Sequence, residues 1–210
     1  MKHPHLRQAQ FLLFGLLTLF ISGCANNSTI THSYIDPNVH KLNLNGVLVI
    51  AVTQKMPARI NFEDAFVAAL KRRGATAVAS HTLLPGKKPT EEQVMAAATA
   101  ANLDTVLVTR YIGKREQEIY HPGTIYYGVA PVYAPGFGGY YGHAYEVAYQ
   151  QPVYSSNVTF TLISDLFATD GKEHLWQAVS DTIKAGGTNK LRDDVISGFV
   201  GNMKDEGLFD

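Results

Sequence analysis

The chain has 210 residues, of which 18 are basic and 18 acidic, so it carries no formal net charge when its histidines are neutral. This balance argues against nucleic acid as a partner, because proteins that bind phosphate backbones concentrate lysine and arginine on one surface. The single cysteine excludes an internal disulfide bond, and no Cys/His cluster has the spacing of a metal site. We therefore expect one domain with a leader, and no metal or other cofactor.

The first 23 residues have the pattern of a signal peptide. Lys2 and Arg7 precede an apolar stretch from Phe11 to Ile21, and two small residues then lead to Cys24. The apolar stretch has about 11 residues, whereas a helix that spans a bilayer needs roughly 20. We interpret residues 1–23 as a leader that is removed from the mature protein.

The run LFISGC at residues 19–24 resembles the lipobox of bacterial lipoproteins. The resemblance implies that the Cys24 thiol receives a diacylglyceryl group, that the leader is cut off before Cys24, and that the new amino terminus is acylated. Two or more acyl chains anchor a protein stably to a membrane, whereas one chain does not. Two alternatives stay open: an ordinary secretory signal with an incidental cysteine, and an uncleaved anchor.

The residue after Cys24 bears on the location of the protein. In lipoproteins of bacteria with two membranes, an aspartate at this position tends to retain the protein in the inner membrane. Because the residue here is Ala25, the resemblance implies a lipid anchor in the outer membrane that faces the periplasm. Inner-membrane retention and surface exposure stay open.

A flexible tether is expected at residues 24–44, which are mainly polar, lack periodicity and include Pro37. A single domain is expected at residues 45–206. It begins with the apolar run GVLVIAV at residues 46–52, which is rich in β-branched side chains. Such a run is typical of a central strand covered on both faces.

Strands and helices then alternate along the chain. Asn61 can cap a helix that Gly74 ends, and Thr90 with Gln93 matches a capping box at the start of a second helix. The expected elements are a helix from Asn61 to residue 73, a strand at 75–80, a helix from Thr90 onwards and a strand at 104–111. This order indicates parallel strands joined by right-handed crossovers.

The last third of the domain predicts a hairpin and a closing helix. Residues 155–167 alternate between apolar and polar, Asp170-Gly171 marks a turn, and residues 174–182 form the return strand. A helix is expected at about 190–204. The predicted fold class is thus α/β (α+β): a three-layer domain with a mixed sheet, in which βαβαβ is followed by an antiparallel hairpin and a C-terminal helix. We expect Trp176 to be buried against this helix near Phe199.

The hairpin also carries a resemblance. Residues 162–167 (LISDLF), the turn 170–172 (DGK) and residues 175–178 (LWQA) are similar to a hairpin of many poorly characterised outer-membrane lipoproteins. The order of elements resembles the periplasmic domains of the curli-secretion lipoprotein and of the amino-terminal part of the Tol-system β-propeller protein. The resemblance implies the fold and only an envelope setting, because one fold hosts many functions.

An insert at residues 120–154 interrupts the domain and holds nine of the 11 tyrosines. Tyrosine has an apolar body and a polar tip and is favoured at recognition surfaces. The candidate partner-binding residues are Tyr126, Tyr127, Tyr133, Tyr140, Tyr141 and Tyr145. The alternatives are a self-packed or mobile loop without a partner, membrane or self-association, and an extension of the hairpin past the sheet.

The sequence holds no recognisable catalytic motif. The turn after residues 46–52 lacks the glycines of a phosphate-binding loop, and neither Gly-x-Ser-x-Gly nor His-Glu-x-x-His occurs. The carboxylates open to a hydrolase are Asp64, Asp104, Asp165 and Asp181. We expect a non-catalytic lipoprotein that binds an envelope protein, peptidoglycan or another glycan; the alternatives are a cell-wall hydrolase and an oligomeric secretion component.

Overall fold

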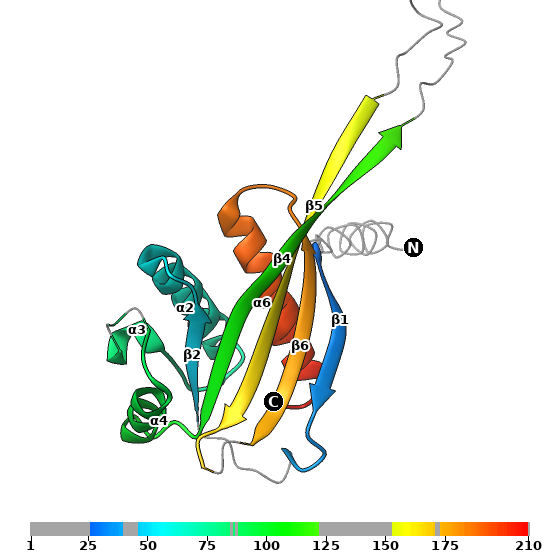
Figure 1. Ribbon diagram of the computed structural model, residues 1–210. Helices are drawn as coiled ribbons and strands as arrows, with labels where there is room; N and C mark the ends of the chain where they lie inside the picture. The colour runs from blue at the N-terminus through cyan, green and yellow to red at the C-terminus, as the bar shows by residue number, and fades with distance from the viewer. Residues whose placement is uncertain are drawn as a thin grey trace, which may run out of the picture.

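The computed structural model describes residues 26–39, 46–84, 86, 88–121, 153–170 and 173–209. The described chain is mixed α/β, with one six-stranded sheet in the order β1-β6-β5-β4-β2-β3 and four helices (Figure 1). The strands are β1 (Ser28–Ile35), β2 (Val47–Val52), β3 (Ala77–Ala79), β4 (Thr105–His121), β5 (Val153–Ala168) and β6 (His174–Ile183). The helices are α2 (Met56–Lys71), α3 (Ser80–Leu83), α4 (Glu91–Ala100) and α6 (Thr188–Asp205).

The sheet is mixed, as predicted. Strand β2 pairs in parallel with β3 and with β4, while β4, β5 and β6 pair antiparallel with one another in chain order. The first half of the domain is therefore the predicted βαβαβ unit, and the second half is the predicted hairpin followed by a helix.

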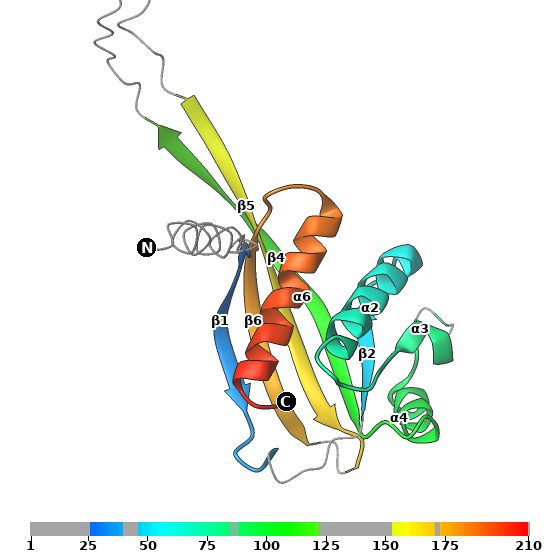
Figure 2. The ribbon, with the colours of Figure 1, turned by 180° about the vertical axis from the view of Figure 1, so that it is seen from behind.

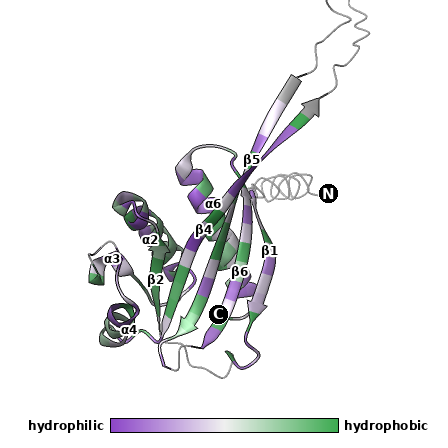
Figure 3. Cartoon of the chain, in the orientation of Figure 1, coloured by the Kyte–Doolittle hydropathy of each residue, from purple (hydrophilic) through white to green (hydrophobic). Residues whose placement is uncertain are grey.

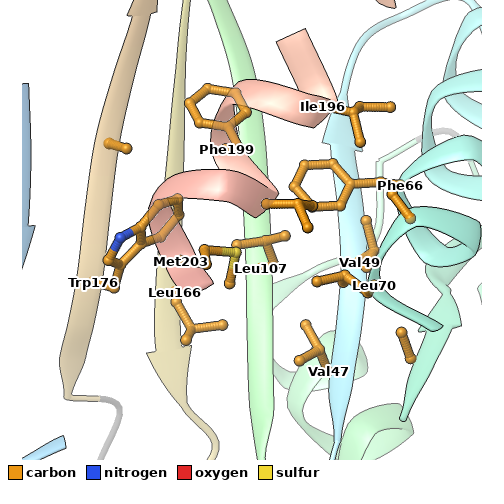
Figure 4. Close-up of a cluster of buried hydrophobic side chains, with 14 of the residues drawn as sticks. Val47, Val49, Phe66, Leu70, Leu107, Leu166, Trp176, Ile196, Phe199 and Met203 are labelled. Carbon is orange, nitrogen blue, oxygen red and sulfur yellow. The ribbon is translucent and has the colours of Figure 1, made fainter. Parts of the chain in front are cut away.

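The main core lies between the sheet and the pair α2 and α6, which cover the same face (Figure 2). Alternate residues of each strand point into it because side chains alternate between the two faces of a sheet. Val49 and Leu107 enter from the sheet, and Phe66 and Phe199 enter from the helices, where their rings stack at 6.4 Å (Figure 4). This burial of apolar surface is the main stabilising term of the domain.

Trp176 occupies the part of this core under α6. Its side chain is 0% exposed, and its ring meets Phe199 edge-on at 6.2 Å. The indole Nε1–H donates a hydrogen bond of 3.0 Å to Oδ1 of Asn202, also on α6. The predicted burial of Trp176 beside Phe199 is confirmed.

Helix α4 covers part of the opposite face. A smaller cluster there joins Ala98 of α4 to Leu48 and Ile50 of β2 and to Val106 of β4. The three-layer arrangement therefore exists over β2 and β4, whereas Figure 1 shows no described helix over β5, β6 and β1 on this face. The predicted capping box is confirmed, since Thr90 and Gln93 exchange both hydrogen bonds at the start of α4.

Three boundaries differ from those expected. Helix α2 begins at Met56 rather than at Asn61, because Pro57 fits the first turn, where an amide hydrogen is not needed. Ser80 begins the short helix α3 instead of ending a strand. Strand β4 continues to His121 instead of ending at residue 111, because it pairs with β5 along its whole length.

Strand β1 lies inside the segment 24–44 that we expected to be a tether. It pairs antiparallel with β6, and the pairing shifts register between Ile30 and His32. This bulge places Ile30 and Ile35 on the same face, where both pack against the main core. Ile30 and Ile35 are five positions apart, whereas residues on one face of a regular strand are an even number of positions apart. The bulge therefore hides the alternation that marks a strand in a sequence.

Asp194 of α6 fixes the chain just before β1. Its carboxylate accepts a hydrogen bond from Asn27 at 3.0 Å and pairs with Lys190 at 2.9 Å. Burial raises the pKa of Asp194, but the hydrogen bonds from Asn27 and Lys190 and the charge of Lys190 outweigh it, so the net shift is downward. The contact lies at the start of the described chain, which begins two residues after Cys24.

Replacement of Trp176 with alanine should lower the free energy of unfolding by about 3–5 kcal/mol, the usual cost of emptying a large buried aromatic site. Tyr111→Ala is the matched control, since Tyr111 is 52% exposed and its loss should cost less than about 1 kcal/mol. Denaturant unfolding of both variants measures the difference. Equal costs would show that Trp176 contributes little to the core.

Candidate functional site

A cleft of about 830 Å³ opens on the α4 side of the sheet, beside the end of β2. Its walls are largely apolar and come from three strands and one helix. They are Ile50 and Val52 of β2, Val106 and Val108 of β4, Phe167 of β5, and Val94 and Met95 of α4. Val52 is 57% exposed, so an apolar side chain faces solvent at the mouth of the cleft.

The chain path explains where the cleft lies. The connection after β2 enters α2 on one face of the sheet, while the connection after β3 returns through α4 on the other face. Adjacent connections that leave toward opposite faces open a crevice at the carboxyl ends of parallel strands, and ligands of open α/β sheets bind in such crevices. The cleft lies beside this point, on the α4 side of β2 and β4.

The rim of the cleft is polar. Thr53 and Gln54 contribute from the turn after β2, Lys88 from the segment before α4, and Glu91 from the first position of α4. The rim therefore presents one positive and one negative side chain around an apolar interior. A few polar groups around an apolar interior are typical of sites that bind small molecules or the side chains of a partner.

Arg59 lines the floor of the cleft, although its side chain is almost fully buried. Its Nε donates to Oε1 of Glu63 at 2.9 Å, and its other nitrogens donate to Ser80 Oγ and to the carbonyl oxygen of Gly86, both at 2.6 Å. The guanidinium group is thus held by partners on three segments, and its positive charge is balanced inside the protein by Glu63.

Glu63 is the centre of this network. Its side chain is 0% exposed and also accepts hydrogen bonds from Ser80 Oγ at 2.7 Å, the amide of Ala51 at 3.0 Å and the amide of His81 at 2.8 Å. Through these bonds one carboxylate joins the end of β2 to α2 and to the start of α3. It fixes the backbone around the cleft.

A second polar cluster lies on the same face of the sheet, next to Phe167. Asp165 Oδ1 accepts a hydrogen bond from Gln177 Nε2 at 2.6 Å and lies 3.1 Å from His174 Nε2. The His174 ring lies between Phe167, at 4.8 Å, and Tyr34, at 5.6 Å. A carboxylate beside an imidazole can orient it as a general base, but the same contacts also hold β5 to β6.

The other candidate carboxylates lie apart from one another. Asp64 pairs with His81 at 2.7 Å, Asp104 accepts a hydrogen bond from the Gly46 amide, and Asp181 accepts one from Thr161. Each of these bonds joins neighbouring elements of the fold. The His–Asp pairs escaped the sequence analysis because their members are 17 and nine positions apart and only the fold brings them together.

The site residues predicted from the sequence lie outside the described residues. This applies to Cys24, the proposed lipidation site, and to the six tyrosines of the insert: Tyr126, Tyr127, Tyr133, Tyr140, Tyr141 and Tyr145. The structure does describe strands β4 and β5, which lead into and out of the insert as an antiparallel pair up to His121 and Val153.

Within the described ranges, no three histidine, cysteine, aspartate or glutamate side chains gather as a metal site would require. None of the helices described is both long and apolar enough to cross a bilayer.

Comparison with solved structures finds similar arrangements at low sequence identity. The PelC dodecamer from Paraburkholderia phytofirmans is 13% identical, over 82% of this chain and 94% of that chain, with a TM-score of 0.45. The lipoprotein GNA1162 from Neisseria meningitidis is 10% identical, over 76% of this chain and 98% of that chain, with a TM-score of 0.40. No family model and no curated protein matches the sequence. Likeness at these values identifies neither a family nor a function.

Removal of the Glu63 carboxylate should destabilise the fold strongly. Glu63→Leu would leave the Arg59 guanidinium buried without its counter-charge, which typically costs about 3–5 kcal/mol. The double variant Arg59→Met, Glu63→Leu should be more stable than the single one, because it removes both charges. Denaturant unfolding of the two variants measures this, with Glu173→Leu at an exposed position as the control. A double variant no more stable than the single one would contradict it.

Proposed function

We propose that this protein is a lipoprotein of the bacterial cell envelope, anchored through Cys24, and that it acts by binding a partner rather than by catalysis. The anchor is supported by the lipobox-like run at residues 19–24, and the outer membrane is supported by Ala25. On this proposal the domain faces the periplasm.

The cleft beside β2 is the single observation that supports a binding role. Its interior is apolar, its rim carries few polar groups, and it lies beside the carboxyl end of the parallel strand β2. The buried charges beneath it, Arg59 and Glu63, are satisfied by each other and by the backbone, so they serve to hold the cleft in shape.

The tyrosine-rich insert is the second binding surface that we propose. Its two ends are carried by β4 and β5, which extend past the rest of the sheet (Figure 1). The chemistry of its tyrosines suits a glycan, peptidoglycan or an envelope protein, because aromatic rings stack on sugars and pack on apolar patches.

A hydrolase that acts on cell-wall material is the second candidate. The Asp165–His174 pair supports it, because a carboxylate-oriented imidazole can act as a general base. His174→Gln distinguishes the two: it should abolish hydrolysis of purified peptidoglycan if the protein is this enzyme, and should leave partner binding unchanged if it is not.

The first test concerns the anchor. Mass spectrometry of the protein from a diderm host should find an acylated amino terminus at Cys24, and membrane fractionation should place it in the outer membrane. Cys24→Ala should prevent lipidation and leave the leader uncleaved by the lipoprotein peptidase. An unmodified amino terminus at another residue would disprove the anchor.

The second test separates the two proposed surfaces by capture from native envelopes. One variant replaces Tyr126, Tyr127, Tyr140 and Tyr141 with serine, and another replaces exposed Val52 at the mouth of the cleft with lysine. Each surface that binds should lose affinity by more than about 1 kcal/mol for each hot spot removed. The control is Tyr111→Ser, an exposed tyrosine that lines neither surface. Full capture by every variant would contradict both surfaces.

A further inference from the structure

Strands β4 and β5 are much longer than their neighbours. Residues Gly113–Ile119 of β4 pair with Ser155–Thr161 of β5, and we call this part of the hairpin the ribbon. Strand β6 reaches only to Thr159 of β5, and β2 reaches only to Arg110 of β4. The ribbon is thus largely a two-stranded projection from the sheet (Figure 2).

The β4 side of the ribbon is an open edge. Past Arg110, no strand of the described chain pairs with this side of β4. The register of β4 against β5 shifts at Ile112, between Tyr111 and Gly113, and is then regular from Gly113 to Ile119. These seven residues span about 24 Å and offer a straight row of backbone donors and acceptors.

An open edge of this kind is a template for another strand, and an isolated two-stranded ribbon is only marginally stable in water. The ribbon carries mainly hydrophilic residues (Figure 3), and Lys114 to Glu118 are all exposed. Its partner must therefore match a row of charges and backbone groups rather than an apolar surface.

The charges on this edge are complementary to those on the same edge of a second copy of the protein. The sequence KREQE at residues 114–118 has two positive side chains at one end and a negative one, Glu118, at the other. Lys114 already pairs with Glu116 at 2.7 Å, and Arg115 with Asp181 at 3.3 Å. Read antiparallel onto itself about Glu116, the edge places Lys114 opposite Glu118 on both sides of the axis.

We propose that β4 pairs edge to edge with β4 of a second copy, antiparallel, about a two-fold axis at Glu116. The two ribbons then form a four-stranded sheet, with Lys114 opposite the partner's Glu118 and Arg115 opposite the partner's Gln117. Opposite charges directly across an antiparallel pair stabilise it, and like charges destabilise it.

Neighbouring registers fit less well. An axis at Gln117 places Glu116 opposite the partner's Glu118 twice. An axis at Arg115 pairs Lys114 with the partner's Glu116 and places two arginines opposite each other, but it extends the pairing into the irregularity at Ile112. An axis at Glu116 leaves one like pair, the two Glu116 carboxylates, and each already accepts a hydrogen bond from its own Lys114.

Charge reversal tests the proposal on the full chain in detergent, with the dimer dissociation constant measured by analytical ultracentrifugation. Lys114→Glu and Glu118→Lys should each weaken the dimer about tenfold or more, because each puts like charges opposite at two places. The double variant should restore the dimer, because both charges of each pair are reversed and are opposite in sign again. Lys55→Glu, the same charge change on an exposed residue outside the ribbon, should have no effect.

Disulfide trapping tests the register. Glu116→Cys should cross-link to itself under mild oxidation, because a two-fold axis places the two residues opposite each other. Lys114→Cys should not, since its two copies lie about 14 Å apart along the strands. The chain without an added cysteine is the blank. A monomer at all concentrations, a double variant no better than the single ones, or equal cross-linking at both positions would overturn the proposal.

Discussion

The buried pair of Arg59 and Glu63 is the interaction on which the candidate site depends. A buried carboxylate is tolerated only when it is paired and hydrogen-bonded, and Glu63 receives four hydrogen bonds from three different segments. One of them comes from the amide of Ala51, close to the end of β2. The pair thereby fixes the turn where the chain passes from the sheet to α2, and Thr53 and Gln54 of that turn line the cleft.

The sequence predicted the parts of the fold in which one local pattern dominates. The apolar run of β2, the capping box of Thr90 and the buried Trp176 each follow from a single physical preference, and each is confirmed. The parts that it missed depend on a partner distant in the chain. Strand β1 exists because β6 offers it an edge, and its bulge hides the alternation of Ile30 and Ile35.

The site could not be predicted for the same reason, because its contacts join residues that are distant in the chain. The predicted start at Asn61 would put Glu63 in the first turn of the helix, but α2 begins earlier, at Met56. In the fold, Glu63 lies in mid-helix, facing Arg59 one turn before it and Ser80 on another element. An acidic residue near a helix start looks the same in a sequence whether it interacts with the helix dipole or with a buried arginine.

The described chain begins close in sequence to the proposed anchor, Cys24, and this limits how the domain lies on a membrane. Ser28 of β1 pairs with Thr182 of β6, and Thr182 pairs in turn with Phe160 of β5. Phe160 pairs with Lys114 of the ribbon, so these residues form one row across the sheet. The first described residues of the chain therefore lie at the base of the ribbon. In the proposed dimer, Lys114 of one copy and Lys114 of the other lie about 14 Å apart along the strands, and so do the two rows. A two-fold axis perpendicular to the sheet keeps the start of the described chain on the same face of the sheet in both copies.

Both lipids can enter one bilayer if the strands lie along its surface. Strands that stood upright would turn one copy, and its anchor, away from the membrane. The anchor and the ribbon, taken together, thus favour a domain that lies flat on the membrane.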